Sequence, residues 1–309
     1  MQLSLVIPLF NEKESLAPLC EWIEKSIGGQ FTYEIILVDD GSSDNSWNEV
    51  VNLKNKHPEV NGIKLRRNYG KSAALNTGFA AAKGDVVITM DADLQDSPEE
   101  IPSLYAMITD DGYDIVSGWK KERHDPITKT IPTKLYNWAT RKLSGIHLND
   151  MNCGLKAYNA DVIKNIEVYG EMHRYIPVIA KSAGFSKIGE KVVKHQARKY
   201  GETKFGLNRF SRGLLDLMTI SFMSRFGKRP MHFFGSIGLL FTLTGTIMLA
   251  VLTIQKLVHK ISGIASRPLF FLGMLLMIIG IQLFIAGFLA EMISRNSPKR
   301  NEDAISETI

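Results

Sequence analysis

Short apolar runs alternate with mixed polar segments up to about residue 230 of the 309-residue chain. The runs are rich in Val, Ile and Leu, and most are followed by Gly, Asn or Asp, a pattern typical of strands that are buried on both faces of a parallel sheet. Strand–helix alternation of this kind predicts an α/β fold with a doubly wound, mostly parallel sheet. We therefore expect strands at residues 3–10, 33–38, 62–65, 85–90 and 114–117.

The segments between these runs carry signals for helix starts. Asn11 is followed three residues later by Glu14, a capping-box pattern that predicts that Asn11 caps the helix after the first strand. Further helices are expected from about Ser46, over 72–83 and from Pro98, because Ser and Pro are common at the first positions of helices.

Two long apolar segments near the end of the chain predict a pair of membrane spans. Residues 232–254 and 268–290 carry no formal charge, and each is long enough to cross a hydrocarbon core of ~30 Å. A short link would join them as an antiparallel hairpin. The expected organisation is an α/β domain (1–206), an amphipathic juxtamembrane helix (207–230), a first span (231–255), a connecting loop (256–267), a second span (268–291) and a polar cytoplasmic tail (292–309). The tail is expected to be disordered from Ser294 onward.

The first domain is expected to stay in the cytoplasm, since residues 3–10 are too short and lack the basic flank of a signal peptide. Basic residues flank the spans on both sides, so loop charge alone does not set the orientation. The sequence has only two cysteines, Cys20 and Cys153, which indicates neither a disulfide framework nor a zinc site.

The chemistry begins with Asp91 and Asp93, directly after the predicted strand 85–90. Two carboxylates so close to a buried strand end are costly without a cation. Ligands of open α/β sheets bind at the carboxyl ends of strands, where a divalent cation would bridge the carboxylates to a diphosphate. Gln95 and Asp96 add further oxygen donors.

A second acidic pair, Asp39 and Asp40, ends the strand 33–38 at the same predicted edge of the sheet. A carboxylate there can accept hydrogen bonds from a nucleobase or a ribose. The alternative is an Asx turn that caps the next helix, because Asp-Asp-Gly-Ser is also good turn chemistry.

Two basic segments would supply the opposite charge. Residues 119–142 hold seven basic against two acidic side chains, and residues 195–205 form a basic loop that contains Gly201. The first segment could hold a lipid phosphate, and its alternatives are a solvated basic face or attraction to anionic lipid. The second segment could close over an anionic ligand with Gly201 as a hinge, and its alternative is an ordinary surface loop. Nucleic acid is a poor candidate, because the rest of the domain is not basic and two spans tie it to a bilayer.

Taken in order, these motifs resemble the family 2 glycosyltransferases with a GT-A (Rossmann-like) fold. More narrowly, the chain is similar to polyprenyl-phosphate sugar transferases, namely dolichyl-phosphate mannose synthases and bacterial glucosyltransferases of the GtrB type. The matching stretches are VIPLFNE at 6–12, VDDGSSD at 38–44, NYGK at 68–71, MDADLQD at 90–96, CGLKAY at 153–158 and RKYGETK at 198–204.

The resemblance implies roles for individual positions. Residues that would bind the nucleotide-sugar are Pro8, Phe10, Glu12, Asp39, Asp40, Lys71 and Asp91. Residues that would hold Mg²⁺ or Mn²⁺ are Asp91, Asp93 and Gln95. Residues that would hold the acceptor phosphate are Lys120, Lys134 and Arg198, with Arg123 and Lys204 from the same basic segments. The family usually has arginine where this chain has Lys120 and Lys134, and lysine lacks the bidentate fork. Asp150 matches an acidic position near the reaction centre.

The expected activity is inverting transfer of a hexose, from a UDP-glucose or GDP-mannose type of donor, to undecaprenyl or another polyprenyl phosphate, for cell-envelope glycan or glycolipid modification. The expected location is a bacterial inner membrane, with the catalytic domain on the cytoplasmic side. The chain is also expected to form a homo-oligomer, for which a tetramer is one candidate. Two alternatives stay open: a transferase that acts on a lipid or glycan hydroxyl, and a processive polysaccharide synthase. The synthase would carry a Gln-x-x-Arg-Trp motif, which the segment 196–200 lacks.

Overall fold

The computed structural model describes residues 1–121, 140–141, 144–170, 172–196, 229–259, 267–296 and 305–308, with single positions at 219, 222, 226 and 263. The chain divides into two units. The first comprises Met1–Ser221 with Arg300–Ile309, and the second comprises Phe222–Lys299.

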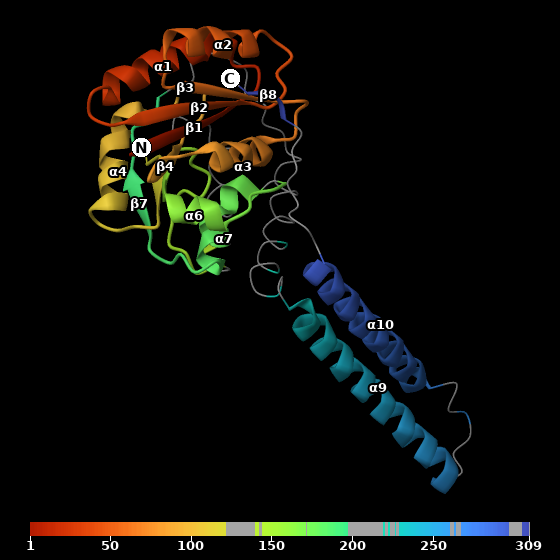
Figure 1. The fold of residues 1–309 in the computed structure, drawn as a ribbon. Helices are drawn as coiled ribbons and strands as arrows, with labels where there is room; N and C mark the ends of the chain where they lie inside the picture. Colours follow the sequence, from red (N-terminus) through yellow and green to blue (C-terminus); the bar gives the residue numbers. More distant parts are fainter. Residues whose placement is uncertain are drawn as a thin grey trace. The chain divides into compact units, whose positions relative to one another are not determined.

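The first unit is built on a twisted sheet that runs through its centre (Figure 1). Among the described residues eight strands join it, in the order β7-β5-β6-β4-β1-β2-β3-β8. The strands are β1 (Leu3–Leu9), β2 (Tyr33–Asp39), β3 (Val60–Leu65), β4 (Val86–Thr89), β5 (Ile115–Trp119), β6 (Lys156–Asn159), β7 (Ile188–Val192) and β8 (Ile305–Thr308). Strands β1 to β4 pair in parallel, as predicted. The sheet as a whole is mixed, because β6 runs antiparallel to β4 and β5, and β8 runs antiparallel to β3.

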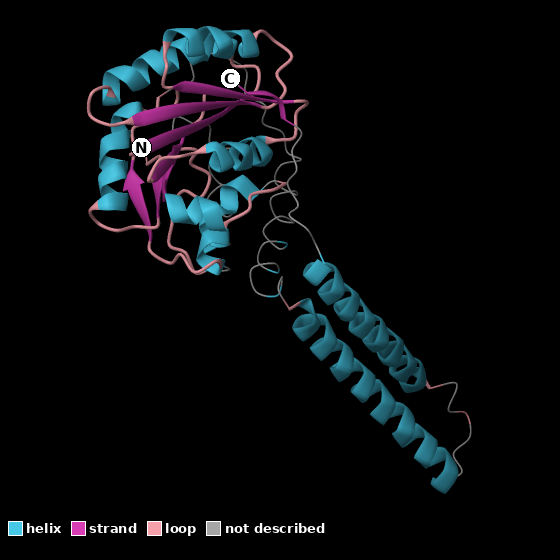
Figure 2. Ribbon diagram, viewed as in Figure 1, coloured by secondary structure: helices cyan, strands magenta, loops and turns pink. Residues whose placement is uncertain are grey.

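Helices cover both faces of this sheet (Figure 2). They are α1 (Lys13–Ile27), α2 (Ser46–Lys56), α3 (Lys71–Ala81), α4 (Ile101–Thr109), α6 (Ala160–Asn165) and α7 (Ile176–Ser182), with 3-10 turns at Pro98–Glu100 and Met172–Tyr175. One core lies under α1, α2 and α4, and the other lies under α3, α6 and α7. Successive residues of a strand point to opposite faces, so Leu5 and Ile7 of β1 enter the first core and Val6 enters the second.

The capping prediction for Asn11 is wrong. Helix α1 begins at Lys13 after Glu12, with no side-chain cap. Asn11 has a positive φ of 56°, and its Oδ1 accepts a hydrogen bond of 2.9 Å from the backbone N–H of Ser43. Asn11 therefore joins the loop after β1 to the loop after β2, because its short amide tolerates the left-handed conformation.

The expectation of a disordered tail is wrong for residues 305–308, and residues 297–304 lie outside the described residues. Residues Ile305–Thr308 form β8, which pairs with β3 at the edge of the sheet. The segment is too short and polar to be recognised as a strand, and it acquires that structure only against a neighbour.

Within the described part of the second unit, the long helices are α9 (Pro230–His259) and α10 (Pro268–Asn296). Apolar stretches of 29 and 26 residues within them are long enough to cross a membrane, and their side chains remain largely exposed. Glycines bring the two backbones together: a Cβ at Gly238 would lie 2.6 Å from the carbonyl oxygen of Gly280, and one at Gly245 would lie equally close to that of Gly273. Small residues at such crossings are typical of packed membrane helices. Most of the expected juxtamembrane helix, 207–230, lies outside the described residues.

Candidate functional site

The strand order reverses between β1 and β4, which makes the carboxyl ends of these two strands the switch point of the sheet. Asp91 follows β4 at this point, and Lys71 begins α3 beside it. The Nζ of Lys71 forms an ion pair with Oδ1 of Asp91. Burial by itself raises the pKa of Asp91, but attraction by Lys71 and Lys120 outweighs burial and lowers that pKa to about 2. Asp91 is therefore ionised at any physiological pH.

A cleft with about 320 Å³ of space, part of it open to solvent, lies at this switch point. Its lining includes Pro8 from β1, Lys71, Asp91 and the pair His173–Arg174. The cleft therefore carries one carboxylate among several basic side chains, an arrangement suited to an anionic ligand.

Gly154 forms the wall of the cleft directly beside Asp91. A Cβ at this position would lie 2.6 Å from Oδ2 of Asp91, and the carbonyl oxygen of Gly154 accepts a hydrogen bond of 2.8 Å from the hydroxyl of Thr89. Because residue 154 has no side chain, the carboxylate of Asp91 can occupy its position in the cleft without a steric clash.

The turn after Asp91 carries the other predicted metal ligands. Asp93 is 9% exposed, and its Oδ1 accepts from the backbone N–H of Gln95 at 3.2 Å. Leu94 lies between them at a φ of 60° and is buried in the core. A buried Leu in the left-handed region is strained, which indicates that packing holds the turn in this shape. The donor set of two carboxylates and an amide suits a hard divalent cation.

The second acidic pair lies at the end of β2, and its two members differ. Asp40 accepts from the backbone N–H groups of Tyr69 and Gly70, at 2.7 and 2.9 Å, and so holds the loop that precedes α3. Asp39 is fully buried; its Oδ1 accepts from the backbone N–H of Ser42 at 2.9 Å. Its Oδ2 has no hydrogen-bond partner within the part of the chain that the structure describes. The Asx-turn interpretation thus holds for one oxygen of Asp39, while the other lies buried without a hydrogen-bond partner among the described residues.

Phe10 and Glu12 follow β1 and are half-buried. The backbone N–H of Glu12 donates to Oγ of Ser46 at 3.0 Å, which ties this loop to the first turn of α2. The residues predicted to bind a nucleotide are therefore gathered from the ends of β1 and β2 and the start of α3, although Pro8, Lys71 and Asp91 alone of that predicted set line the described cleft.

Of the residues predicted to hold the acceptor phosphate, Lys120 is the one that the structure describes. Its Nζ lies 2.7 Å from Oδ1 of Asp96, in a pair whose side chains are 14% and 0% exposed. Burial alone lowers the pKa of Lys120, but Asp96 outweighs burial and raises it. Arg123, Lys134, Arg198 and Lys204 lie outside the described residues.

The start of the second basic segment is nevertheless bound to the acidic turn. Gln196 donates its backbone N–H to the carbonyl of Gln95 at 2.9 Å, and Asp96 forms an isolated β-bridge with His195. The chain that leads into the basic loop therefore begins at the turn that carries Asp93 and Gln95.

Asp150 is buried but is not among the residues that line the cleft. Its Oδ1 accepts from the backbone N–H of Asn152 at 3.1 Å, and its own N–H donates to Glu190 at 2.9 Å. Because Asn152 does line the cleft, Asp150 shapes the turn that leads to Gly154.

Three residues that were not predicted as site residues also line the cleft: His173, Arg174 and Lys156. The Nζ of Lys156 donates to the backbone carbonyls of Met151 and Cys153, and burial lowers its pKa. His173 and Arg174 lie more than 80 residues from Asp91 along the chain, so no local motif connects them.

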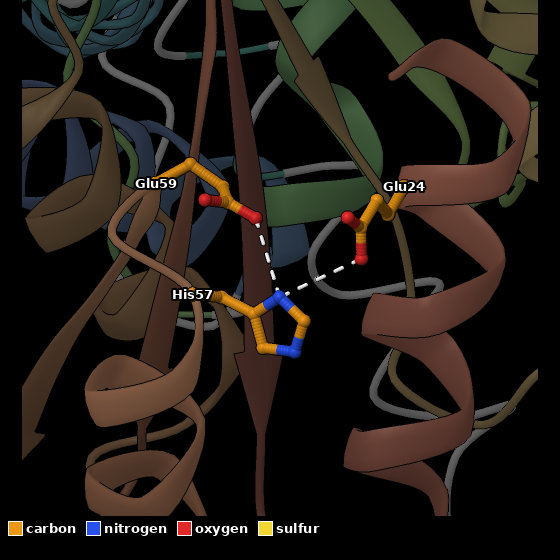
Figure 3. Close-up of side chains that lie close together, drawn as sticks. All are labelled: Glu24, His57 and Glu59. Carbon is orange, nitrogen blue, oxygen red and sulfur yellow. Dashed lines mark ion pairs between the residues drawn. The ribbon is translucent and has the colours of Figure 1, made fainter.

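A separate polar cluster is formed by Glu24, His57 and Glu59 (Figure 3). Nδ1 of His57 lies 3.6 Å from Glu24 of α1 and 3.4 Å from Glu59, just before β3. These contacts join α1 to the loop before β3, at the amino-terminal end of that strand, whereas Asp91 follows the carboxyl end of β4.

Comparisons with known proteins agree with this fold. The sequence model of the family described as "Glycosyl transferase family 2" matches residues 4–166. The chain is 38% identical to a dodecaprenyl-phosphate galacturonate synthase of Rhizobium johnstonii, over 96% of this chain and 88% of the relative. It is 35% identical to an undecaprenyl-phosphate 4-deoxy-4-formamido-L-arabinose transferase of Proteus mirabilis, over 95% and 89% of the two chains.

Solved structures show the same fold at lower identity. Glucosyl-3-phosphoglycerate synthase of Mycobacterium tuberculosis, in complex with Mn²⁺ and UDP-glucose, superimposes with a TM-score of 0.53 at 19% identity, over 72% of this chain and 78% of that chain. The parallel strands, the acidic strand ends, the family match and the two bacterial relatives lead to one conclusion: this chain belongs to glycosyl transferase family 2 and is a glycosyltransferase.

Proposed function

We propose that this chain is a membrane-bound enzyme that transfers a sugar from a nucleotide-sugar to a polyprenyl phosphate. The observation that carries the proposal is Asp91, held by Lys71 in a basic cleft at the switch point of the sheet. Two helices long enough to span a membrane support a lipid acceptor. The names of the relatives from Rhizobium and Proteus, both polyprenyl-phosphate sugar transferases, point to the same acceptor.

The nucleotide would lie over the ends of β1 and β2. Oδ2 of Asp39 is a buried acceptor without a hydrogen-bond partner among the described residues. A buried carboxylate oxygen is costly unless a donor reaches it, and an N–H of a nucleobase supplies such a donor. Asp40 keeps the loop of Tyr69 and Gly70 beside it, so this wall is formed before the ligand arrives.

A divalent cation fits the acidic turn. Asp91, Asp93 and Gln95 offer the oxygen ligands that Mg²⁺ and Mn²⁺ prefer, and Gly154 leaves room beside Asp91. The Mn²⁺ in the mycobacterial structure supports such a cofactor here. When bound, the cation would neutralise the charge of the leaving diphosphate.

The reaction is a single displacement at the anomeric carbon. An oxygen of the acceptor phosphate forms the new bond to that carbon while the bond to the diphosphate oxygen breaks, and the nucleoside diphosphate leaves with the electron pair. The configuration inverts. A phosphate oxygen is already anionic at neutral pH, so no strong general base is needed. Lys71 and Arg174 would orient the anionic groups, and Asp150 would act by shaping the turn at Asn152.

The membrane setting follows from the same elements. Two spans return the chain to the side from which it entered, and we place the catalytic domain on the cytoplasmic side of a bacterial inner membrane, where nucleotide-sugars are made. A homo-oligomer, with a tetramer as the expected size, completes the proposal.

The experiment is a product assay with the purified full chain in mild detergent. The protein is incubated with undecaprenyl phosphate, Mn²⁺ or Mg²⁺, and one donor at a time: UDP-glucose, GDP-mannose, UDP-galacturonate or UDP-4-formamido-arabinose. We expect a charged glycolipid with one donor, and no product when EDTA removes the metal. A neutral glycolipid formed only with a hydroxyl acceptor, or no product with any donor, would contradict the proposal.

A matched pair of variants tests the acidic turn. Asp93→Asn is expected to lower turnover at least ~100-fold, because a neutral amide brings no negative charge to the divalent cation and binds it more weakly than a carboxylate does. Asp85→Asn, at an exposed position just before β4, is expected to keep the parent activity. Near-normal turnover of Asp93→Asn would remove this residue from the metal site.

A further inference from the structure

Strand β3 would be the outermost strand on the side of β1 and β2, but β8, from near the end of the chain, pairs with it. β8 runs antiparallel to β3, with Ile63 opposite Thr308 and Lys64 opposite Glu307. More than 230 residues separate the two strands in the sequence. An open edge strand exposes a row of unpaired N–H and C=O groups, and β8 satisfies part of that row on β3.

One side chain of β8 reaches a helix as well as the strand. Oε2 of Glu307 accepts a hydrogen bond of 2.9 Å from the indole N–H of Trp47. Trp47 lies in α2, is 7% exposed, and has the ammonium of Lys64 at 5.7 Å from its ring centroid. Glu307, Trp47 and Lys64 therefore join β8, α2 and β3 in a single contact.

This contact lies at the first turn of α2, next to the loop that follows Asp39. Ser46, the residue before Trp47, accepts the backbone N–H of Glu12 at 3.0 Å and donates to Asp44 at 2.6 Å. The same turn thus holds the loops after β1 and β2 together on one side and meets β8 on the other.

We propose that residues 305–308 are a docking strand by which the chain braces its own nucleotide-binding loops. The surface is the edge of β3 with the indole N–H of Trp47, and the occupant is the chain's own C-terminal segment. Docking would hold the first turn of α2 and, through Ser46, the loops that carry Glu12 and Asp39. The effect on nucleotide binding rests on the proposed function; the docking itself does not.

A disulfide test locates the strand. Lys64→Cys and Glu307→Cys are introduced together; directly opposed residues on antiparallel strands have Cα atoms ~4.5–5.5 Å apart, within the range of a disulfide. The native Cys20 and Cys153 are buried and give little background. We expect a bond within one chain after mild oxidation. The control pairs Lys64→Cys with Thr308→Cys, which face opposite sides of the sheet, and should form the bond much more slowly.

Mixing the two single-cysteine chains, Lys64→Cys and Glu307→Cys, separates docking within a chain from docking between copies. Disulfide-linked dimers from this mixture, without a bond inside the double variant, would overturn the proposal and assign the strand to a neighbouring copy. Absence of any bond in both experiments would overturn docking altogether.

A kinetic test addresses the brace. Glu307→Ala and a deletion of residues 305–309 are expected to raise the KM for the nucleotide-sugar ~3–10-fold, since one hydrogen bond and a strand contact are lost. The KM for the lipid acceptor should stay within twofold. Glu307→Gln keeps an oxygen acceptor for Trp47 and should behave nearly as the parent. If these variants have a lower unfolding temperature but an unchanged KM for the nucleotide-sugar, β8 contributes only to stability, and the proposed effect on the nucleotide-binding loops is overturned. A parent chain that binds no nucleotide would instead overturn the proposed function and leave the disulfide result standing.

Discussion

His173 and Ser72 contact each other twice across the wall of the cleft. The backbone N–H of His173 donates to the hydroxyl oxygen of Ser72 at 3.0 Å, and Nδ1 of the imidazole lies 3.1 Å from the same oxygen. Burial, reinforced by the positive charges of Lys71 and Arg174, lowers the pKa of His173 well below 6.5. The imidazole is therefore neutral at pH 7.

This pKa shift predicts a specific loss of stability in acid. Below pH 6.5 the unfolded chain binds a proton at this imidazole that the folded chain does not, so stability falls as the pH falls through that value, by up to about 1.4 kcal/mol per pH unit. In His173→Gln the unfolding temperature should fall less steeply between pH 6.5 and 5 than in the parent. Thermal unfolding followed by fluorescence at a series of pH values measures this, and parallel profiles would contradict it.

Lys71→Met is predicted to change metal and donor binding in opposite directions. The ammonium of Lys71 neutralises Asp91 and competes with a cation for the carboxylate, so the variant should bind Mn²⁺ more tightly in the absence of nucleotide. The KM for the nucleotide-sugar should rise ~10-fold or more, because an anchor for the diphosphate is lost. Mn²⁺ titration by electron paramagnetic resonance and donor kinetics give the two readouts. Lys83→Met, an exposed lysine just beyond the same helix, is the control; weaker Mn²⁺ binding by Lys71→Met would refute the competition.

Gly154→Ala is predicted to displace Asp91. The new Cβ would lie 2.6 Å from Oδ2 of Asp91, and the backbone at 154 cannot easily retreat, because Thr89 binds its carbonyl. We expect turnover to fall ~100-fold, as misplacement of a reacting group by about 1 Å does elsewhere, with weaker Mn²⁺ binding. Circular dichroism should show an intact fold. Unchanged Mn²⁺ affinity would show that Asp91 does not depend on this space.

The two thiols are predicted to be inert in the folded protein. Burial, with nearby carboxylates, raises the pKa of Cys20 and of Cys153 to about 12. Since only the thiolate is nucleophilic, neither should react with Ellman's reagent at pH 8 until the chain is unfolded. Rapid release of one equivalent of thionitrobenzoate from the native enzyme would contradict this burial.

Gly238→Val is predicted to separate the two membrane helices. Its side chain would meet the carbonyl oxygen of Gly280 at 2.6 Å and the backbone nitrogen of Phe284 at 2.8 Å. Overpacking of this kind costs about 1–3 kcal/mol, so the unfolding temperature in mild detergent should fall by several degrees. Ile281→Val, at a half-exposed position of α10, should leave it nearly unchanged. Equal melting of the two variants would show that these helices do not depend on close contact.

The central strands could be predicted closely from the sequence. β1 to β4 agree with the predicted strands to within one or two residues at most ends, because strands buried on both faces read as continuous apolar runs. β6, β7 and β8 were not predicted. Segments such as KAYN and ISET are short and polar, and they become strands only when a neighbouring strand satisfies their backbone groups.

The candidate site divides in the same way. The carboxylates at the ends of β2 and β4 could be located because parallel strands bring their carboxyl ends to one edge. The pairing of Asp91 with Lys71, of Asp96 with Lys120, and of Asp40 with the loop at Tyr69 could not, because these partners lie 20 to 30 residues apart. Their contacts depend on how the loops pack.

Local sequence patterns alone determined the parallel half of the sheet, the two apolar helices and the acidic strand ends. Each of these can be recognised within a short segment, from an apolar run and the residues that directly follow it. Tertiary structure decided which residues meet: Lys71 with Asp91, Gly154 beside that same carboxylate, and Glu307 with Trp47. Such contacts join segments that are far apart in the chain. Their energies come from burial and electrostatics that exist only once the core has closed around them.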